Sequence, residues 1–229
     1  MTGVVSVEDA LAAVRSRIHE ACRRSGRTPG DVTLVAITKT VPLGIVRRAW
    51  EAGVEHFGEN YAAELADKAP QVPGTWHFVG KLQTGTARHV GDHADVIHSA
   101  APGPALQRVA RRATTRGKAI PCLVQVDFTG KRQGVVADEA RGFIEETIGL
   151  AGIRIVGLMT LPPWTGDPDA TRPYFRRLRE LRDSLQEAWP DVRELSMGMS
   201  GDYEVAVEEG ATMLRVGTAL FGERPALLG

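Results

Sequence analysis

From Leu34 onward, short apolar segments alternate with longer amphipathic ones, and this alternation restricts the possible folds more than any other feature of the chain. Each apolar segment has the length and composition of a buried strand. The segments between them show helical periodicity and end at glycine or before proline. The predicted strands are 34–40, 55–59, 75–80, 95–99, 121–128, 153–161, 193–199 and 212–219. The predicted helices that follow them are 42–53, 61–69, 82–90, 103–115, 138–149, 169–189 and 202–209.

Eight strands joined by helical crossovers predict a closed parallel barrel, the (β/α)8 or TIM-barrel form of the α/β class. The alternative is an open doubly wound sheet, which normally has fewer strands and a glycine-rich nucleotide motif. Neither GxGxxG nor GxxxxGK[ST] occurs in this chain. Ser6 and Asp9 form a capping pair that opens a further helix, which continues to about Arg24. We therefore expect a single barrel domain over residues 1–229, with an extra N-terminal helix.

The balanced charge of the chain argues against partners that bind through long-range electrostatics. The 28 basic and 28 acidic residues cancel, so no net field attracts nucleic acid or an anionic membrane. No apolar run approaches the roughly 18 residues of a membrane span, and charged residues interrupt the N-terminal segment where a signal peptide is apolar. Cys22 and Cys122 lie far apart in the sequence and form no CxxC motif, which indicates reduced thiols rather than a disulfide framework. We expect a cytoplasmic monomer that binds neither nucleic acid nor membrane.

The first predicted strand, LVAITKT, carries Lys39 near its C-terminal end, where a barrel places its reactive groups. Burial of an ammonium group is unfavourable and lowers its pKa. This cost is tolerated where an amine must attack a carbonyl and form a Schiff base. A lysine at a strand end more often extends into solvent, so Lys39 becomes a candidate only together with other residues.

The ends of the last two predicted strands supply a candidate phosphate site. Gly201 allows the backbone to approach a ligand closely, and a helix with unpaired first amides follows it. Ser200 could donate its hydroxyl, although it could also be an ordinary N-cap. Gly217 and Thr218 add a second amide and a second hydroxyl. Together these residues predict a site for a small phosphate ester, with Lys39 across the mouth of the barrel.

Side-chain alternation in the last predicted strand predicts that Arg215 points into the barrel. Leu214 and Val216 are branched and suit the face that packs against helices, which turns Arg215 to the opposite face. An arginine inside a barrel cannot be a solvated surface charge. It must therefore meet a partner there.

Longer motifs make the sequence recognisable, since it resembles the pyridoxal-phosphate-binding homeostasis family, which is related to the N-terminal barrel domain of alanine racemase. The matching stretches are LVAITKT, HFGENY, WHFVGKLQ, IHS, GLMTL, SMGMSGDYEVAVEEGATM and LRVGTALFG. They extend from the first predicted strand to the last. Two segments depart from the family pattern: Thr84-Gly85-Thr86 replaces the usual Ser-Asn-Lys, and 128–131 matches only loosely. Partner contacts carried by these two loops are therefore not implied.

The resemblance implies that pyridoxal 5'-phosphate is held as a Schiff base on Lys39, the one catalytic residue it assigns. The cofactor-binding residues that it implies are Lys39, Asn60, Ser99, Met159, Ser200, Gly201, Arg215, Gly217 and Thr218. Arg215 would face the pyridine nitrogen. Because an arginine does not give up a proton, the ring would stay unprotonated and be a weaker electron sink. No metal is expected, because His89 and His93 have helical ligand spacing but lack a third ligand.

Three functions fit these residues: a carrier of pyridoxal phosphate, an amino-acid racemase, and an aldolase-type barrel whose lysine would commonly lie on a later strand. Racemisation requires acid–base groups on both faces of the reacting carbon. In the alanine racemases that this chain resembles, the second group is a tyrosine from a separate C-terminal domain. Here the chain ends at Gly229, and Tyr61, Tyr174 and Tyr203 offer no clear substitute. We expect a carrier without efficient catalysis that serves cofactor homeostasis or delivery to apo forms of pyridoxal-phosphate enzymes, with the racemase as the alternative.

Overall fold

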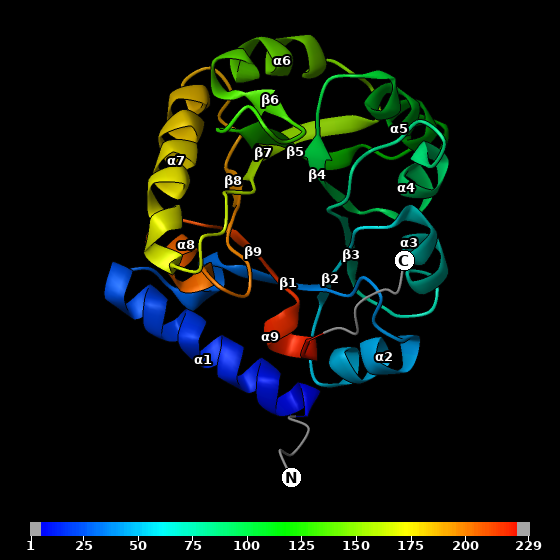
Figure 1. The fold of residues 1–229 in the computed structure, drawn as a ribbon. Coiled ribbons are helices and arrows are strands. Elements are labelled where there is room, and N and C mark those ends of the chain that lie inside the picture. Colours follow the sequence, from blue (N-terminus) through cyan, green and yellow to red (C-terminus); the bar gives the residue numbers. More distant parts are fainter. Residues whose placement is uncertain (1–5, 224–229) are drawn as a thin grey trace.

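The apolar segments pair side by side because each following helix returns the chain to the same end of the sheet, which makes the strands parallel. In the computed structural model, which describes residues 6–223, they form a closed ring (Figure 1). The ring strands are β1 (Thr33–Ile37), β2 (His56–Glu59), β3 (Thr75–Phe78), β4 (Val96–Ala100), β5 (Ile120–Asp127), β7 (Ile153–Thr160), β8 (Glu194–Ser196) and β9 (Met213–Val216). Their order is β4-β3-β2-β1-β9-β8-β7-β5, and β5 also pairs with β4. The predicted TIM barrel is confirmed.

One strand lies outside the ring and was not predicted. The two-residue strand β6 (Val135–Val136) pairs with the end of β5. It belongs to the loop after β5, a few residues beyond segment 128–131. Gly134 makes this pairing possible, because it has φ 138° and a Cβ there would lie 2.6 Å from the carbonyl oxygen of Gln125.

Helices surround the barrel and cover its outer face (Figure 1). They are α1 (Val7–Ser25), α2 (Leu43–Glu51), α3 (Ala62–Lys68), α4 (Ala87–His93), α5 (Pro104–Thr115), α6 (Ala140–Thr147), α7 (Arg172–Gln186), α8 (Tyr203–Glu208) and α9 (Thr218–Phe221). The added helix α1 begins at the predicted cap, where Ser6 accepts a hydrogen bond from the Asp9 amide, and it packs against α8 and α9. Among the described helices, none is long and apolar enough to cross a membrane.

Several predicted boundaries were too wide. The first strand ends at Ile37, so Lys39 lies in the turn that follows it. The last strand ends at Val216, and the short helix α9 replaces the remainder of the predicted segment. Helix α4 begins only at Ala87, after a loop. Both ends of the predicted 1–229 domain lie outside the described residues.

The core has two layers. The larger layer fills the space between the strands and the helices, with Phe57, Trp76 and Phe175 among its fully buried members. A small apolar cluster, which includes Leu123 and Met159, fills part of the barrel interior. The rest of the interior is polar.

Candidate functional site

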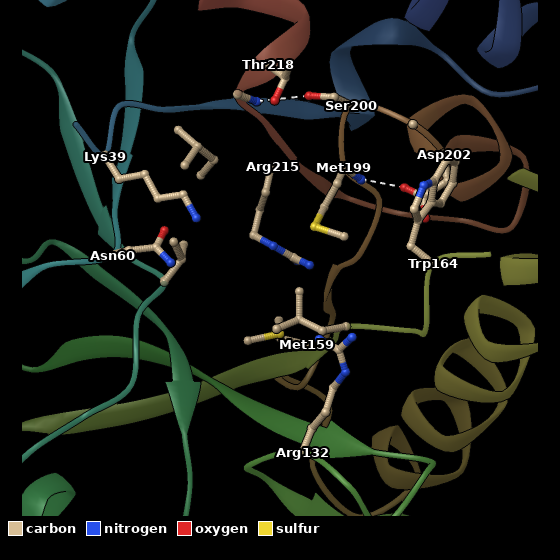
Figure 2. A pocket seen from close by; sticks show the side chains of 15 residues that line it. Lys39, Asn60, Arg132, Met159, Trp164, Met199, Ser200, Asp202, Arg215 and Thr218 are labelled. Atoms are coloured by element: carbon tan, nitrogen blue, oxygen red, sulfur yellow. Dashed lines mark hydrogen bonds between the residues drawn. The ribbon is translucent and has the colours of Figure 1, made fainter. Parts of the chain in front are cut away.

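A cavity of about 460 Å³ opens at the C-terminal ends of the barrel strands, where the sequence predicts the chemistry (Figure 2). Its wall comes from β1, β7, β9 and the loops that follow β1, β2, β3, β5, β7, β8 and β9. The wall residues are Ile37, Lys39, Asn60, Val79, Arg132, Met159, Leu161, Trp164, Met199, Ser200, Gly201, Asp202, Arg215, Gly217 and Thr218.

Lys39 occupies a tight turn at the end of β1. The turn is closed by a hydrogen bond of 3.0 Å from the Val41 amide to the Thr38 carbonyl. Thr40, the residue after the lysine, has φ 60°, in the left-handed region that threonine rarely adopts. The half-buried Lys39 side chain extends into the cavity beside Asn60 (Figure 2). The lysine is therefore presented by an unusual backbone conformation rather than by a strand.

Arg215 projects from β9 into the barrel, which confirms the orientation predicted from alternation. Only 4% of the residue is exposed. Its guanidinium donates to the hydroxyl of Ser196 and, at 2.9 Å, to the carbonyl of Thr160. Burial lowers the pKa of Arg215 to about 10, and the nearby carboxylate of Asp202 opposes this effect. At neutral pH the cavity floor therefore carries a fixed positive charge.

A chain of hydrogen bonds continues from Arg215 through the barrel interior. Ser196 Oγ lies 2.7 Å from His98 Nδ1, and His98 Nε2 lies 2.8 Å from His77 Nδ1. His77 Nε2 lies 3.0 Å from Nδ1 of His56, at the N-terminal end of the barrel. Because Arg215 can only donate, Ser196 accepts that bond and directs its own proton to His98. In this arrangement His98 and His77 accept at Nδ1 and donate at Nε2, and His56 accepts at Nδ1, so the lone pairs at Nδ1 point toward the buried cation.

The loops after β8 and β9 are joined by one hydroxyl. Ser200 Oγ accepts hydrogen bonds from the amides of Gly217 and Ala219, at 3.2 and 3.1 Å. It therefore keeps its own proton for another acceptor. Within the described part of the chain, the amides of Ser200, Gly201 and Thr218 donate to no protein acceptor. This side of the cavity offers several donors suited to an anion.

Two large side chains complete the rim. Trp164, in the loop after β7, lies against Gly201, where an added Cβ would be 2.6 Å from the indole ring. Arg132, in the loop after β5, extends its side chain toward the cavity near Met159 (Figure 2). Among the described wall residues Asp202 is the one carboxylate, and it accepts a hydrogen bond of 2.6 Å from the Met199 amide. Cationic groups therefore dominate the cavity.

The cavity brings together all the predicted site residues except Ser99. Ser99 is fully buried and donates to the carbonyl of Gly80. Side chains alternate along a strand, and the neighbouring His98 points into the barrel, so Ser99 points away from it. Ser99 therefore supports the loop after β3 and does not line the cavity.

Sequence analysis missed Ser196 and Thr160, which accept hydrogen bonds from Arg215, and His98, which contacts Ser196. The equal spacing of His56, His77 and His98, 21 residues apart on consecutive strands, is a signal that could have found the histidine chain. It also missed Arg132 and did not assign Trp164 to the site. Among residues 6–223, no group of histidines, cysteines and carboxylates could hold a metal ion.

Comparison with known proteins gives a consistent result over nearly the whole chain. Residues 10–225 match the family described as the alanine racemase N-terminal domain. The pyridoxal phosphate homeostasis protein of Aquifex aeolicus is 38% identical, over 93% of this chain and 96% of that protein. The protein of the same name from Pseudomonas aeruginosa is 36% identical, over 96% of both chains.

Solved structures agree with the sequence matches. PipY of Synechococcus elongatus, determined with pyridoxal phosphate bound, superposes with a TM-score of 0.83 at 34% identity, covering 95% of this chain and all of PipY. An alanine racemase of Clostridium difficile superposes with a TM-score of 0.74, covering 96% of this chain and 58% of the racemase. At 16% identity the racemase shows a shared fold alone. By sequence and by structure, this chain belongs to the pyridoxal phosphate homeostasis protein family, which is built on the barrel of the alanine racemase N-terminal domain.

Proposed function

We propose that this protein binds pyridoxal 5'-phosphate as a Schiff base on Lys39 and serves as a carrier in cofactor homeostasis. The observation that carries the proposal is the convergence of Lys39, Arg215 and the open amides of the β8 and β9 loops on one cavity. The names of the relatives and the bound cofactor of PipY support the same ligand. A cavity of about 460 Å³ is within the usual size of small-molecule sites.

The phosphate end of the ligand fits the loops after β8 and β9. The amides of Ser200, Gly201 and Thr218 and the hydroxyls of Ser200 and Thr218 are donors, and a phosphate has only acceptors. Gly217 lines the same wall. We assign these four residues to the phosphate.

The other wall residues fit the ring and the aldehyde. Lys39 would attack the aldehyde carbon through its neutral amine, and the aldehyde oxygen would leave as water. Arg215 would face the pyridine nitrogen, held in place by Ser196 and Thr160. Asn60 and Met159 would lie beside the ring. When bound, the cofactor supplies an electron sink. This sink is weaker with an arginine partner than with a group that protonates the pyridine nitrogen.

Arg215 and the site composition favour a carrier over a racemase. None of the three tyrosines lines the cavity in the described structure, so none of them is placed to act as a second acid–base group. We further propose that the protein acts in the cytoplasm as a monomer and passes the cofactor to apo forms of pyridoxal-phosphate enzymes.

Chemical trapping tests the assignment of Lys39. The purified protein is mixed with pyridoxal phosphate, reduced with borohydride and digested, and the peptides are mapped by mass spectrometry. We expect one pyridoxyl group, on Lys39, and none in a Lys39→Met variant. Lys131, at the surface near the cavity, is the matched control, since Lys131→Met should leave the labelling unchanged. A pyridoxyl group elsewhere in the wild-type protein contradicts the proposal.

A further inference from the structure

The backbone around Lys39 is held in a conformation that its own sequence does not favour. Thr40 is the one non-glycine residue of the described chain with a positive φ. Branching at Cβ makes the left-handed region especially unfavourable for threonine. Such a conformation persists where the surrounding contacts determine it, and these sites are often functional. The contacts that hold the turn therefore indicate what presents the lysine.

One buried ammonium group links these contacts to one another. Lys68, in the last turn of α3, is only 5% exposed. Its Nζ donates to the Thr38 carbonyl at 2.7 Å, to Glu59 Oε1 at 2.8 Å and to Glu64 Oε2 at 2.6 Å. All three protons of the ammonium are therefore used. One of them goes directly to the residue that precedes Lys39.

The two carboxylates that pair with Lys68 also bind the turn. Glu64 Oε2 accepts a hydrogen bond of 2.7 Å from the Thr40 amide, and Glu59 Oε1 accepts one of 2.7 Å from the Thr38 hydroxyl. Both residues that flank Lys39 are thus fixed by one ionic cluster. Lys39 itself lies between the two points of attachment.

Fold stability alone does not account for this cluster. Buried ion pairs often stabilise a fold no better than apolar residues of similar volume. Glu59 is fully buried, and its Oε2 has no hydrogen-bond partner within residues 6–223. Burial accordingly raises the pKa of Glu59, against the opposing effect of the hydrogen bonds from Lys68 and Thr38. What the cluster does achieve is a fixed geometry on both sides of Lys39.

We propose that Lys68, Glu59 and Glu64 are positioning residues that hold the Lys39 turn and so direct the lysine into the cavity. This inference rests on the proposed function in one respect, that Lys39 is the residue that bonds the cofactor. Without the cluster, Thr40 would relax toward negative φ and the turn would open. The lysine would then meet the aldehyde less often, while the phosphate donors after β8 and β9 would be unaffected.

The main test is Lys68→Met, which keeps the apolar stem and removes the ammonium. We expect the rate of borohydride-trapped labelling of Lys39 to fall about tenfold or more, as for loss of a positioning contact. The affinity for pyridoxine 5'-phosphate, which has the phosphate but no aldehyde, should stay within about twofold. Lys118→Met, at an exposed lysine just after α5, is the matched control and should change neither quantity.

Hydrogen exchange of the cofactor-free protein reports directly on whether the Lys39 turn is closed. Hydrogen exchange of the Thr40 amide should be slow in the wild-type protein and fast in Lys68→Met. Glu64→Ala is a second variant in case Lys68→Met folds poorly, because Glu64 is partly exposed and it accepts the Thr40 amide. It should show the same fast exchange and slow labelling.

Rescue separates positioning from general destabilisation. Glycine adopts positive φ without strain, so Thr40→Gly should restore at least part of the labelling rate when combined with Lys68→Met. Absence of rescue, or wild-type labelling and exchange in both cluster variants, overturns the inference. If Lys39 of the wild-type protein is not labelled at all, the proposed function fails instead, and the exchange data still report on the cluster.

Discussion

Thr218 is the residue at which recognition of the phosphate can be tested most directly. It lies at the exposed start of α9, and its hydroxyl faces the cavity beside Ser200 (Figure 2). A hydrogen bond to a charged group contributes about 1.5–3 kcal/mol. Thr218→Val removes only the hydroxyl, so we expect the affinity for pyridoxal phosphate to fall roughly ten- to a hundredfold, as measured by titration.

Pyridoxal, which lacks the phosphate, is the control ligand for this variant. Its affinity should be the same for the wild-type protein and for Thr218→Val. Equal losses for both ligands would show that Thr218 does not contact the phosphate.

At the scale of elements, one carboxylate joins two neighbouring helices. Asp92 on α4 accepts hydrogen bonds from Arg112 at 2.7 and 3.1 Å and from Arg116 at 2.8 Å, both at the α5 end. Burial acts against ionisation of Asp92, but the two arginines outweigh it and lower its pKa from 3.8 to about 2. The α4–α5 contact therefore depends on a charge that persists in mild acid.

Removal of this charge should destabilise the protein modestly. We expect Asp92→Asn to lower the free energy of unfolding by about 1–2 kcal/mol near pH 7, measured by urea denaturation. The folded pKa lies below the unfolded one, so the contribution of Asp92 is complete above about pH 4 and is lost as the pH falls toward 2. The difference between variant and wild type should shrink over that range. The exposed Asp138, as Asp138→Asn, is the control.

At the scale of the whole molecule, the polar barrel interior makes stability depend on pH. Burial lowers the pKa of His77 from 6.5 to about 3, with a smaller effect from His56, and it lowers the pKa of His98 as well. Between pH 6.5 and 3 the unfolded chain binds protons that the folded chain does not. The free energy of unfolding should therefore decrease as the pH is lowered through this range, by up to about 1.4 kcal/mol per pH unit for each histidine.

His77→Gln tests this origin, because glutamine can both donate and accept within the chain of hydrogen bonds. The free energy of unfolding is measured by urea denaturation between pH 7 and 5. Its slope against pH should correspond to about one proton fewer taken up on unfolding in the variant than in the wild type. An unchanged slope would mean that acid sensitivity arises outside the barrel interior.

The same architecture predicts weak catalysis. Tyr61 is 49% exposed, Tyr203 is buried, and Tyr174 packs near Phe128, so none of the three stands opposite Lys39 in the cavity. We expect the cofactor-loaded protein not to racemise L-alanine or other amino acids efficiently, as followed by loss of optical activity. Turnover at or above about 1 per second, the low end for ordinary enzymes, would favour the racemase instead.

The sequence by itself determined the parts of this protein that depend on near neighbours. The period of the apolar residues distinguished strands from helices. Their regular alternation predicted a parallel barrel, because each helix returns the chain to the same end of the sheet. Alternation within one strand turned Arg215 inward. Strand ends converge on one face of a barrel, so the strand positions alone were enough to place Lys39 beside the loops that hold Ser200 and Thr218.

Only the tertiary structure decided which distant residues meet. His98 and Ser196 are 98 positions apart, and Lys68 reaches Thr38 across 30 positions. Such pairs form because barrel closure and strand register bring them within hydrogen-bonding distance, and no local period encodes that register. Ser99 shows the same limit, since one step along β4 separates a side chain inside the barrel from one behind its wall. The strand ends therefore predicted which residues share the cavity, and the closed barrel brought together the buried residues that contact Arg215 and the turn that carries Lys39.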